Sequence, residues 1–519
     1  ALPPERAEAE GEQVVLDWRK KVSALRFSTP EPALDRYLNG WALYQVLACR
    51  LMARTSQYQN GGAYGFRDHV RALLLTVPER AREQLVLASS RQFPEGDVQH
   101  WWHPPHGAGV RTRITDDLLW LPYVLAEYLE VTGDWSVCGE KTCYLESPPL
   151  REGERERYET PRCSEREDTV YRHALAAIRC AMERGAGSHG LALIGGGDWN
   201  DGMNRVGAGG RGESVWLTWF LALVLRKFAP VCRHMEEPQL AEELLGRAEG
   251  YRKAAEAAWD GNWYRRGYFD SGAPLGTRGA ESCEIDSIAQ SFAALVEDSD
   301  RERACQAVSA ALERLYLPQA GVVKLFDPPF QDRGPDPGYI KGYLPGVREN
   351  GGQYTHGAVW LALACLRLGR TEDGLELLRA LLPERRRTQI YQAEPYVLAA
   401  DVYAAPGHLG RGGWSWYTGA AGWYYRTAVE ELLGLKVREG RLFVEPHLPE
   451  DWPGWTGEWE LDRGRLSIQV SRGRELSVRL DGREIRDGVP LRELTGDHRL
   501  EVTAAPGNGK LCFSAKDVV

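Results

Sequence analysis

The segment VWLTWFLALVLRKF (Val215–Phe228) fixes the fold class, because its apolar side chains recur at the three- and four-residue steps of an α-helix. The same spacing runs through LLWLPYVLAEYLEV (Leu118–Val131), Ala358–Leu368 and Leu375–Leu382. Helical spacing of this kind dominates residues 31–432. We therefore predict a mainly α-helical domain over that range.

The apolar period changes after residue 433. Apolar and polar residues alternate in LSIQV (Leu466–Val470) and again in LSVRL (Leu476–Leu480), on either side of SRGRE. Alternation on both sides of a short polar turn predicts a β-hairpin. The chain of 519 residues is too long for one hydrophobic core. We predict a charged lead-in segment (1–30), the helical domain (31–432) and a small antiparallel β domain (433–519).

Composition excludes some classes of partner. The net charge is −9, without a basic block, which argues against nucleic acid and anionic membranes as main partners. The 10 Cys form no CxxC pair, so reduced thiols are expected. No run of 18 uninterrupted apolar residues occurs, and the first residues lack a signal-peptide layout, so a soluble chain is expected. The 18 Trp and 22 Tyr offer many flat faces that can cover sugar rings or fill cores.

The segment GGGDWNDGMN (Gly195–Asn204) is the first candidate for chemistry. Its glycines permit close backbone approach, and Asp198, Trp199 and Asp201 follow within four residues. A sugar ring stacked on Trp199 could receive a proton from Asp201. The alternative is a turn in which the acids bind backbone groups, and Asp198 fits that structural role better.

A second candidate lies in Arg91–Pro122. His100, His103 and His106 at three-residue steps could suggest a metal, but interleaved prolines and the absence of a recognised zinc spacing argue against it. We predict no metal. The Arg and Asp residues farther along could bind sugar hydroxyls or an anion, or could form a salt-bridged helix start.

Two glycine-rich segments could form anion sites. In GYLPGVRENGGQYTHGAVWLA (Gly342–Ala362), a His follows an Arg-Glu pair at the start of a predicted helix, which suits phosphate. In GRGGWSWYTGAAGWYYR (Gly410–Arg426), a Thr-Gly pair precedes a helix and offers a hydroxyl and backbone N–H groups. A capping loop and an N-cap Thr are the alternatives.

Taken together, these segments resemble glycoside hydrolase family 94, the inverting phosphorylases. Within it they are most similar to the C-terminal phosphorylase-like region of cyclic β-1,2-glucan synthases and to 1,2-β-oligoglucan phosphorylases. The resemblance covers residues 31–455 in unbroken order. The motifs that carry it are YQNGGAYGFRDH, EGDVQHWWHPPHGAGVRTRITDDLLWLP, GGGDWNDGMNRVG with RGESVWL, GYLPGVRENGGQYTHGAVW, AEPYVLAADVY and GGWSWYTGAAGWYYR.

The resemblance implies an (α/α)6 barrel followed by a C-terminal β-sandwich. It implies that Asp201 is the general acid. The implied sugar contacts are Arg111, Asp117, Trp199, Arg348 and Glu349, and the implied phosphate contacts are His356, Thr418, Gly419 and, as a guess, Arg113. Family members carry a large β-sandwich ahead of the helical domain, whereas this chain starts at the lead-in, so it could be a catalytic fragment.

The expected chemistry is phosphorolysis of β-glucosidic bonds in gluco-oligosaccharides, β-1,2-linked on the resemblance alone. Phosphate is already an anionic nucleophile, so an acid suffices and no base is needed, unlike in an inverting hydrolase. We expect inorganic phosphate as co-substrate, no cofactor, and a cytoplasmic chain that forms a homodimer or part of a membrane-bound synthase. An inverting β-glucan hydrolase and a non-catalytic glucan-binding domain are the alternatives. Asp201 should have a raised pKa if it is to be protonated at working pH.

Overall fold

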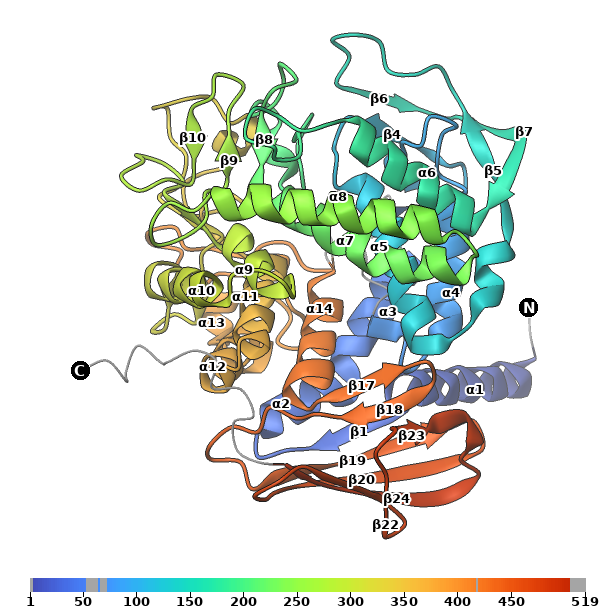
Figure 1. Ribbon diagram of the computed structural model, residues 1–519. Coiled ribbons are helices and arrows are strands. Elements are labelled where there is room, and N and C mark those ends of the chain that lie inside the picture. Colours follow the sequence, from blue (N-terminus) through green and yellow to red (C-terminus); the bar gives the residue numbers. More distant parts are fainter. Residues whose placement is uncertain (1–2, 53–63, 66–71, 417–418, 505–519) are drawn as a thin grey trace.

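The computed structural model describes residues 3–52, 64–65, 72–416 and 419–504. Helices dominate up to residue 432 and strands follow, as the two periods predict (Figure 1). The helices are α1 (Pro4–Val22), α2 (Pro32–Arg36), α3 (Ala42–Met52), α4 (Pro78–Ser89), α5 (Asp117–Thr132), α6 (Val170–Glu183), α7 (Val215–His234), α8 (Pro238–Ala257), α9 (Ser287–Leu295), α10 (Arg301–Leu315), α11 (Thr355–Arg367), α12 (Thr371–Leu381), α13 (Thr388–Tyr391) and α14 (Ala420–Arg426).

Helix α7 is largely buried within the helical domain. Ser214 caps its first turn by accepting a hydrogen bond from the Leu217 amide at 3.0 Å. Its length and composition would let it cross a membrane, but 78% of its most apolar window is buried inside the fold, as in a core helix. It packs against α5, α8 and α9.

The remaining helices pack in neighbouring pairs, such as α5 with α6, α9 with α10 and α11 with α12. The described residues do not establish a closed ring of these pairs. The predicted mainly helical domain is therefore confirmed, and the (α/α)6 barrel stays a prediction.

Small sheets and long loops cover the end of the helical domain that faces away from the C-terminal strands (Figure 1). One sheet has the order β2-β3-β4-β6, formed by Tyr64–Gly65, Gln99–His103, Ala108–Thr112 and Glu156–Glu159. Within the candidate segment Arg91–Pro122, β3 and β4 form an antiparallel β-hairpin.

The C-terminal strands correct the predicted β domain. They are β17 (Leu435–Arg438), β18 (Arg441–Val444), β19 (Gly454–Leu461), β20 (Gly464–Arg472), β21 (Ser477–Leu480), β22 (Arg483–Glu484), β23 (Val489–Pro490) and β24 (Gly496–Ala504). The predicted hairpin of β20 and β21 is wrong, because β24 lies between them, parallel to β20 and antiparallel to β21. The sheet is therefore mixed rather than purely antiparallel, and a complete sandwich stays a prediction.

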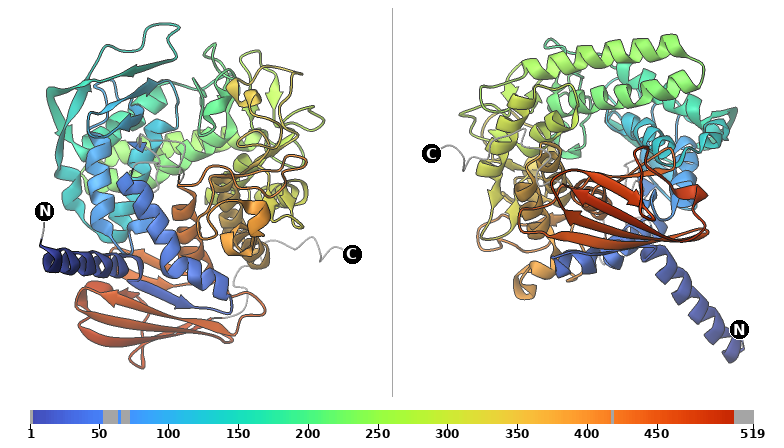
Figure 2. Two further views of the ribbon diagram at one scale, coloured as in Figure 1. Left: turned by 180° about the vertical axis from the view of Figure 1, so that it is seen from behind. Right: turned by 60° about the horizontal axis from the view of Figure 1, so that its bottom comes forward.

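The predicted lead-in segment belongs structurally to this sheet. Strand β1 (Leu25–Ser28) forms its edge and pairs antiparallel with β19, in the order β1-β19-β20-β24-β21-β22. Helix α1, by contrast, buries none of its residues and projects from the body of the molecule (Figure 2).

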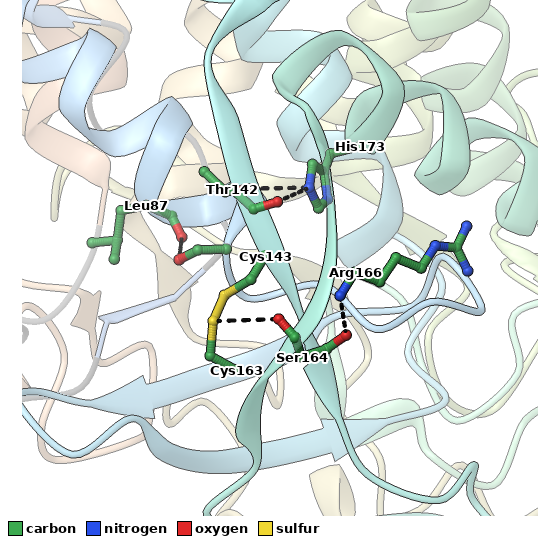
Figure 3. Close-up of a disulfide and its surroundings, with 8 residues drawn as sticks. Leu87, Thr142, Cys143, Cys163, Ser164, Arg166 and His173 are labelled. Atoms are coloured by element: carbon green, nitrogen blue, oxygen red, sulfur yellow. Dashed lines mark hydrogen bonds between the residues drawn. A yellow bond between two sulfur atoms is a disulfide. The ribbon is translucent and has the colours of Figure 1, made fainter.

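The expectation that the cysteines are reduced is wrong at Cys143 and Cys163. Strands β5 (Lys141–Glu146) and β7 (Arg162–Thr169) form a two-stranded ribbon that joins Cys143 and Cys163 as a disulfide, with 5.9 Å between their Cα atoms (Figure 3). The two residues are 20 positions apart, and strand pairing rather than a short CxxC spacing brings them together.

Candidate active site

A cavity of about 310 Å³ opens among the loops at the end of the helical domain that bears β3 and β4. It collects side chains from three segments that the sequence singled out: the β3–β4 hairpin, the loop after residue 195 and the loop before α11. The lining residues are His100, Trp101, Val110, Thr112, Arg113, Ile114, Arg155, Glu156, Gly196, Trp199, Asp201, Asn204, Tyr339, Tyr343, Arg348, Glu349 and Tyr354. Aromatic rings beside carboxylates and guanidinium groups suit a carbohydrate and an anion.

Asp198 anchors the loop that carries the predicted acid. Its side chain is fully buried and accepts hydrogen bonds from Arg266 Nη2 at 2.7 Å and from Ser214 Oγ at 2.7 Å. The same Arg266 lies 3.3 Å from a carboxylate oxygen of Asp286. Asp198 therefore has the structural role that the sequence favoured.

The glycines of this loop let it run against the segment that precedes α5. Gly195 has a φ of +62°, and a Cβ there would come within 2.5 Å of the Arg113 carbonyl oxygen. The amide of Gly196 donates to that carbonyl, and the Gly197 carbonyl accepts from the Thr115 amide. A residue with a side chain could not make this approach at position 195.

Asp201 and Trp199 both face the cavity. Asp201 begins a short 3₁₀-helix, and its side chain is 30% exposed. The Trp199 ring is buried edge-on against Tyr354 and His356, at centroid distances of 5.2 and 5.5 Å. One face of the cavity thus combines an indole with an accessible carboxyl group, as the sequence predicted.

His100 links two predicted site residues, and the sequence reasoning considered it only as a metal ligand. It lies at a bulge of β3, between Gln99 and Trp101. Its Nδ1 atom is 2.7 Å from Asp117 Oδ2, and its Nε2 atom is 3.3 Å from Asp201 Oδ2. A bulge can re-aim a strand side chain, and here it accompanies a histidine held between two carboxylates.

The electrostatics of this triad favour an imidazolium. Burial alone would lower the pKa of His100, but the charges of Asp117 and Asp201 outweigh it and raise the pKa to about 10. Asp117 is the first residue of α5 and has a side chain only 2% exposed. Among the described residues, no group of three or more metal-binding side chains that could hold an ion is found.

Arg348 and Glu349 line the cavity from a tight loop. The Arg348 Nε atom is 3.2 Å from Glu349 Oε2, and Arg348 has a φ of +50°, which is unusual for a residue with a side chain. The buried Asn350 side chain holds the loop by bonding the Phe330 amide and carbonyl. Burial raises the pKa of Glu349, Arg348 opposes the rise, and the nearby Asp201 charge adds to it.

The structure separates the two predicted arginines. Arg111 does not line the cavity: its guanidinium is 1% exposed and pairs with Asp97 at 2.6 Å and Glu95 at 3.0 Å. The alternative of a salt bridge from Arg111 to the start of α5 is not found either. Arg113 does line the cavity, but its guanidinium also donates to the backbone carbonyls of residues 150, 151 and 154. The binding roles of both stay predictions.

His356, one of the predicted phosphate contacts, packs against the Trp199 ring. His356 is the second residue of α11, is 3% exposed and packs against Trp360 and Trp423 with centroid distances of 4.5 and 5.9 Å. Gly419 directly precedes α14, the helix that carries Trp423. Thr418 and most of the motif YQNGGAYGFRDH lie outside the described residues.

Arg155 and Glu156 also reach the cavity, from the segment entering β6. The sequence gave no signal for them because only strand pairing brings β6 beside β4.

A second cavity, of about 200 Å³, is a weaker candidate for an active site. It lies between the helices and β17, and its charged groups are matched with one another. Arg426 pairs with Glu127 at 3.1 Å and with Glu430 at 3.0 Å, and Lys227 pairs with Glu127 at 2.5 Å. We therefore place the candidate active site in the cavity that contains Asp201 and Trp199.

Comparisons with known proteins agree with the geometry. The family model of the glycosyl hydrolase 94 superfamily, catalytic domain, matches residues 17–434. The chain is 45% identical over 464 residues to the cyclic beta-(1,2)-glucan synthase NdvB of Rhizobium meliloti, covering 88% of this chain and 16% of that protein. It is 28% identical over 504 residues to the solabiose phosphorylase of Paenibacillus borealis, covering 94% of this chain and 61% of that protein.

A solved structure has a similar fold at low identity. The GH78 family rhamnosidase of Bacillus sp. GL1 superposes with a TM-score of 0.53 and 14% identity, over 93% of this chain and 44% of that one. This likeness concerns the fold alone. The chain spans less than two thirds of each of these proteins.

Proposed function

Because the chain belongs to the glycosyl hydrolase 94 superfamily, we propose that it is an inverting glycoside phosphorylase in which Asp201 is the general acid. Asp201 protonates the glycosidic oxygen while inorganic phosphate attacks the anomeric carbon from the opposite face. The β-bond becomes α-glucose 1-phosphate and a shortened glucan, or the reverse. The observation that carries this proposal is the Asp201 carboxyl group, which opens beside Trp199 into a cavity also lined by three arginines.

The cavity suits phosphate as the attacking group. Arg113, Arg155 and Arg348 offer positive charge, and guanidinium groups recognise phosphate oxygens well. His356, Thr418 and Gly419 are the phosphate contacts that the family resemblance implies. Phosphate acts as a co-substrate, and the reaction needs no cofactor.

The proposed substrate is a β-glucosidic gluco-oligosaccharide with β-1,2 linkages. The similarity to a cyclic beta-(1,2)-glucan synthase supports the linkage. Trp199 then contacts the reacting glucose, and Arg348 and Glu349 contact the acceptor sugar. Asp117 does not line the cavity and would reach the glucose only if its contact with His100 rearranged. Arg111 would reach the sugar only if its buried ion pairs rearranged.

The proposed architecture is a complete (α/α)6 barrel followed by a C-terminal β-sandwich. The pairwise packing of the helices and the sheet that begins with β1 support it. The chain is proposed to act as part of a larger membrane-bound synthase or as a homodimer. A cytoplasmic location stays a prediction, and the Cys143–Cys163 disulfide counts against it because such bonds persist in oxidising compartments.

Glu349 defines a second candidate function, an inverting hydrolase. It is a half-buried carboxyl group in the same cavity as Asp201, and burial raises its pKa, the direction that suits a general base. Its ion pair with Arg348 favours the acceptor-binding role instead.

A synthesis and phosphorolysis assay tests the proposal. The chain is incubated with α-glucose 1-phosphate and glucose, cellobiose, laminaribiose or sophorose, and released phosphate is measured. Phosphate release that is fastest with sophorose supports a β-1,2 phosphorylase. Glucose release from the oligosaccharides without phosphate supports the hydrolase. Sugar binding without turnover, unchanged in Asp201→Asn, supports a non-catalytic glucan-binding domain.

A further inference from the structure

The side chain of Asp201 is not arranged like that of an acid kept protonated by burial. It is 30% exposed. An aspartic acid in water loses its proton near pH 4, whereas a general acid must hold its proton at neutral pH. If Asp201 acts as the general acid, a neighbouring group must supply its proton.

His100 offers that source at the correct place. Its Nε2 atom lies 3.3 Å from Asp201 Oδ2, and its Nδ1 atom lies 2.7 Å from Asp117 Oδ2. We propose that His100 is a positioning residue that shares one proton with Asp201 and keeps this proton within reach of the carboxyl group at neutral pH. The inference rests on the proposed role of Asp201 as general acid.

The geometry sets the direction of the transfer. Asp117 is a buried carboxylate and accepts the hydrogen of Nδ1, which orients the ring and leaves Nε2 facing Asp201. In the resting enzyme the shared proton sits on Nε2 and Asp201 is ionised. During the reaction the Nε2–H bond breaks and an Oδ2–H bond forms. The Oδ2–H bond then breaks as the departing glycosidic oxygen takes the proton, and His100 is left neutral with its hydrogen on Nδ1.

The resting distance is long for a hydrogen bond, and catalytic hydrogen bonds often shorten when substrate binds. The raised pKa of His100 fits this assignment, since the imidazolium keeps its proton far above neutral pH. Asp117 and Asp201 are the charged groups that contact the ring. Other charged side chains in the cavity are Arg113, Arg155, Glu156, Arg348 and Glu349.

Bound phosphate adds negative charge to the cavity. The charge of Asp201 already contributes to the raised pKa of Glu349, so the two carboxyl groups interact. More negative charge beside Asp201 makes its ionised form less favourable and shifts the shared proton from His100 to the carboxyl group. The proton thus moves to Asp201 when the substrates are in place.

A pH–rate comparison of wild type and His100→Gln tests the inference. Without His100, only the ordinary ionisation of Asp201 supplies the acid, so the variant should lose about 100-fold in rate at pH 8 and less than about 10-fold at pH 5. A merely structural role would lower the rate by the same factor at both pH values. A constant factor, or no loss at all, overturns the inference.

Two further variants separate the possible failures. His103→Gln changes a histidine of the same strand that is outside the cavity lining, and it should keep the wild-type profile. Imidazole added to His100→Gly should restore activity, with a pH dependence that follows free imidazole. If Asp201→Asn keeps wild-type activity, the proposed function itself fails. If Asp201→Asn is inactive but His100→Gln follows the wild-type profile, only the inference about His100 fails.

Discussion

Arg266 and Asp198 form a fully buried ion pair, with 2.7 Å between Nη2 and Oδ1. Asp286 Oδ2 lies 3.3 Å from Nε of the same guanidinium, so one cation faces two buried carboxylates. This arrangement fixes the loop that presents Asp201, three residues farther along the chain.

Arg266→Met should destabilise the fold strongly. Removing the arginine leaves two buried carboxylates without a cation, which costs about 3–5 kcal/mol in the free energy of unfolding. Urea unfolding measures this, with the exposed Arg333→Met as the matched control. A loss below about 1 kcal/mol would contradict the prediction, because it would show that water or a local rearrangement stabilises the two carboxylates without Arg266.

Asp201→Asn should abolish most activity without unfolding the chain. An amide cannot donate the proton that the leaving oxygen needs, so the rate should fall about 10²–10⁴-fold. Formation of α-glucose 1-phosphate measures the rate, and thermal unfolding checks the fold. Asp332→Asn, an exposed carboxyl group outside the cavity, should behave like wild type. Full activity of Asp201→Asn would remove the basis of the proposed function.

Arg348→Ala should weaken acceptor binding in the synthesis direction. Loss of a charged hydrogen-bond donor costs about 1.5–3 kcal/mol, which raises the KM for the acceptor sugar about 10- to 100-fold. The KM for α-glucose 1-phosphate should change little, because the proposed assignment gives Arg348 to the acceptor sugar and Trp199 to the reacting glucose. Initial-rate kinetics with each substrate varied in turn measure both constants. An effect on α-glucose 1-phosphate alone would reverse the assignment of the two subsites.

The stability of the chain should depend on pH through His100. Its pKa is raised from about 6.5 in the unfolded chain to about 10 in the folded one. The stabilisation is therefore complete below about pH 6.5 and is lost as the pH rises through about 10. Between these values wild type should lose more of its unfolding free energy than His100→Gln does, as measured by urea unfolding at each pH. Parallel curves for the two proteins would contradict the raised pKa.

The β5–β7 ribbon should carry an intact disulfide in the purified chain. Peptide mapping without reductant should recover the peptides of Cys143 and Cys163 as one cross-linked species. The Cys143→Ser/Cys163→Ser variant should lose about 3 kcal/mol of unfolding free energy, because the bond closes a loop of moderate length. Two free thiols in the wild-type protein would exclude the bond under the conditions tested.

The sequence predicted elements better than their partners. The apolar spacing of Val215–Phe228 and Leu118–Val131 marks α7 and α5, because a helix face depends on local periodicity. Alternation identified β20 and β21 as strands but paired them wrongly. Both strands pair with β24, which starts 24 residues after β20 ends. No local sequence pattern predicts that β24 lies between them.

The site shows the same division. Trp199 and Asp201 were found because one loop presents both. His100 was missed as a partner of Asp201, because the link depends on a strand bulge and on a loop 100 residues downstream. Its regular spacing from His103 and His106 pointed instead toward a metal. Arg111 is held away from the cavity by ion pairs with Asp97 and Glu95. Nothing in the sequence around these two acids indicates that they pair with Arg111.

The edge strand β1 constrains the order in which the protein can assemble during translation. Phe27 pairs with Gly457, so 430 residues (457 − 27) separate the two partners. At the usual speed of a ribosome, about 20–90 s pass between the synthesis of one and the other. Throughout that interval the β1 segment has no partner strand in its own chain. Chaperones can bind such an unpaired strand, and it can pair wrongly with a strand of another polypeptide.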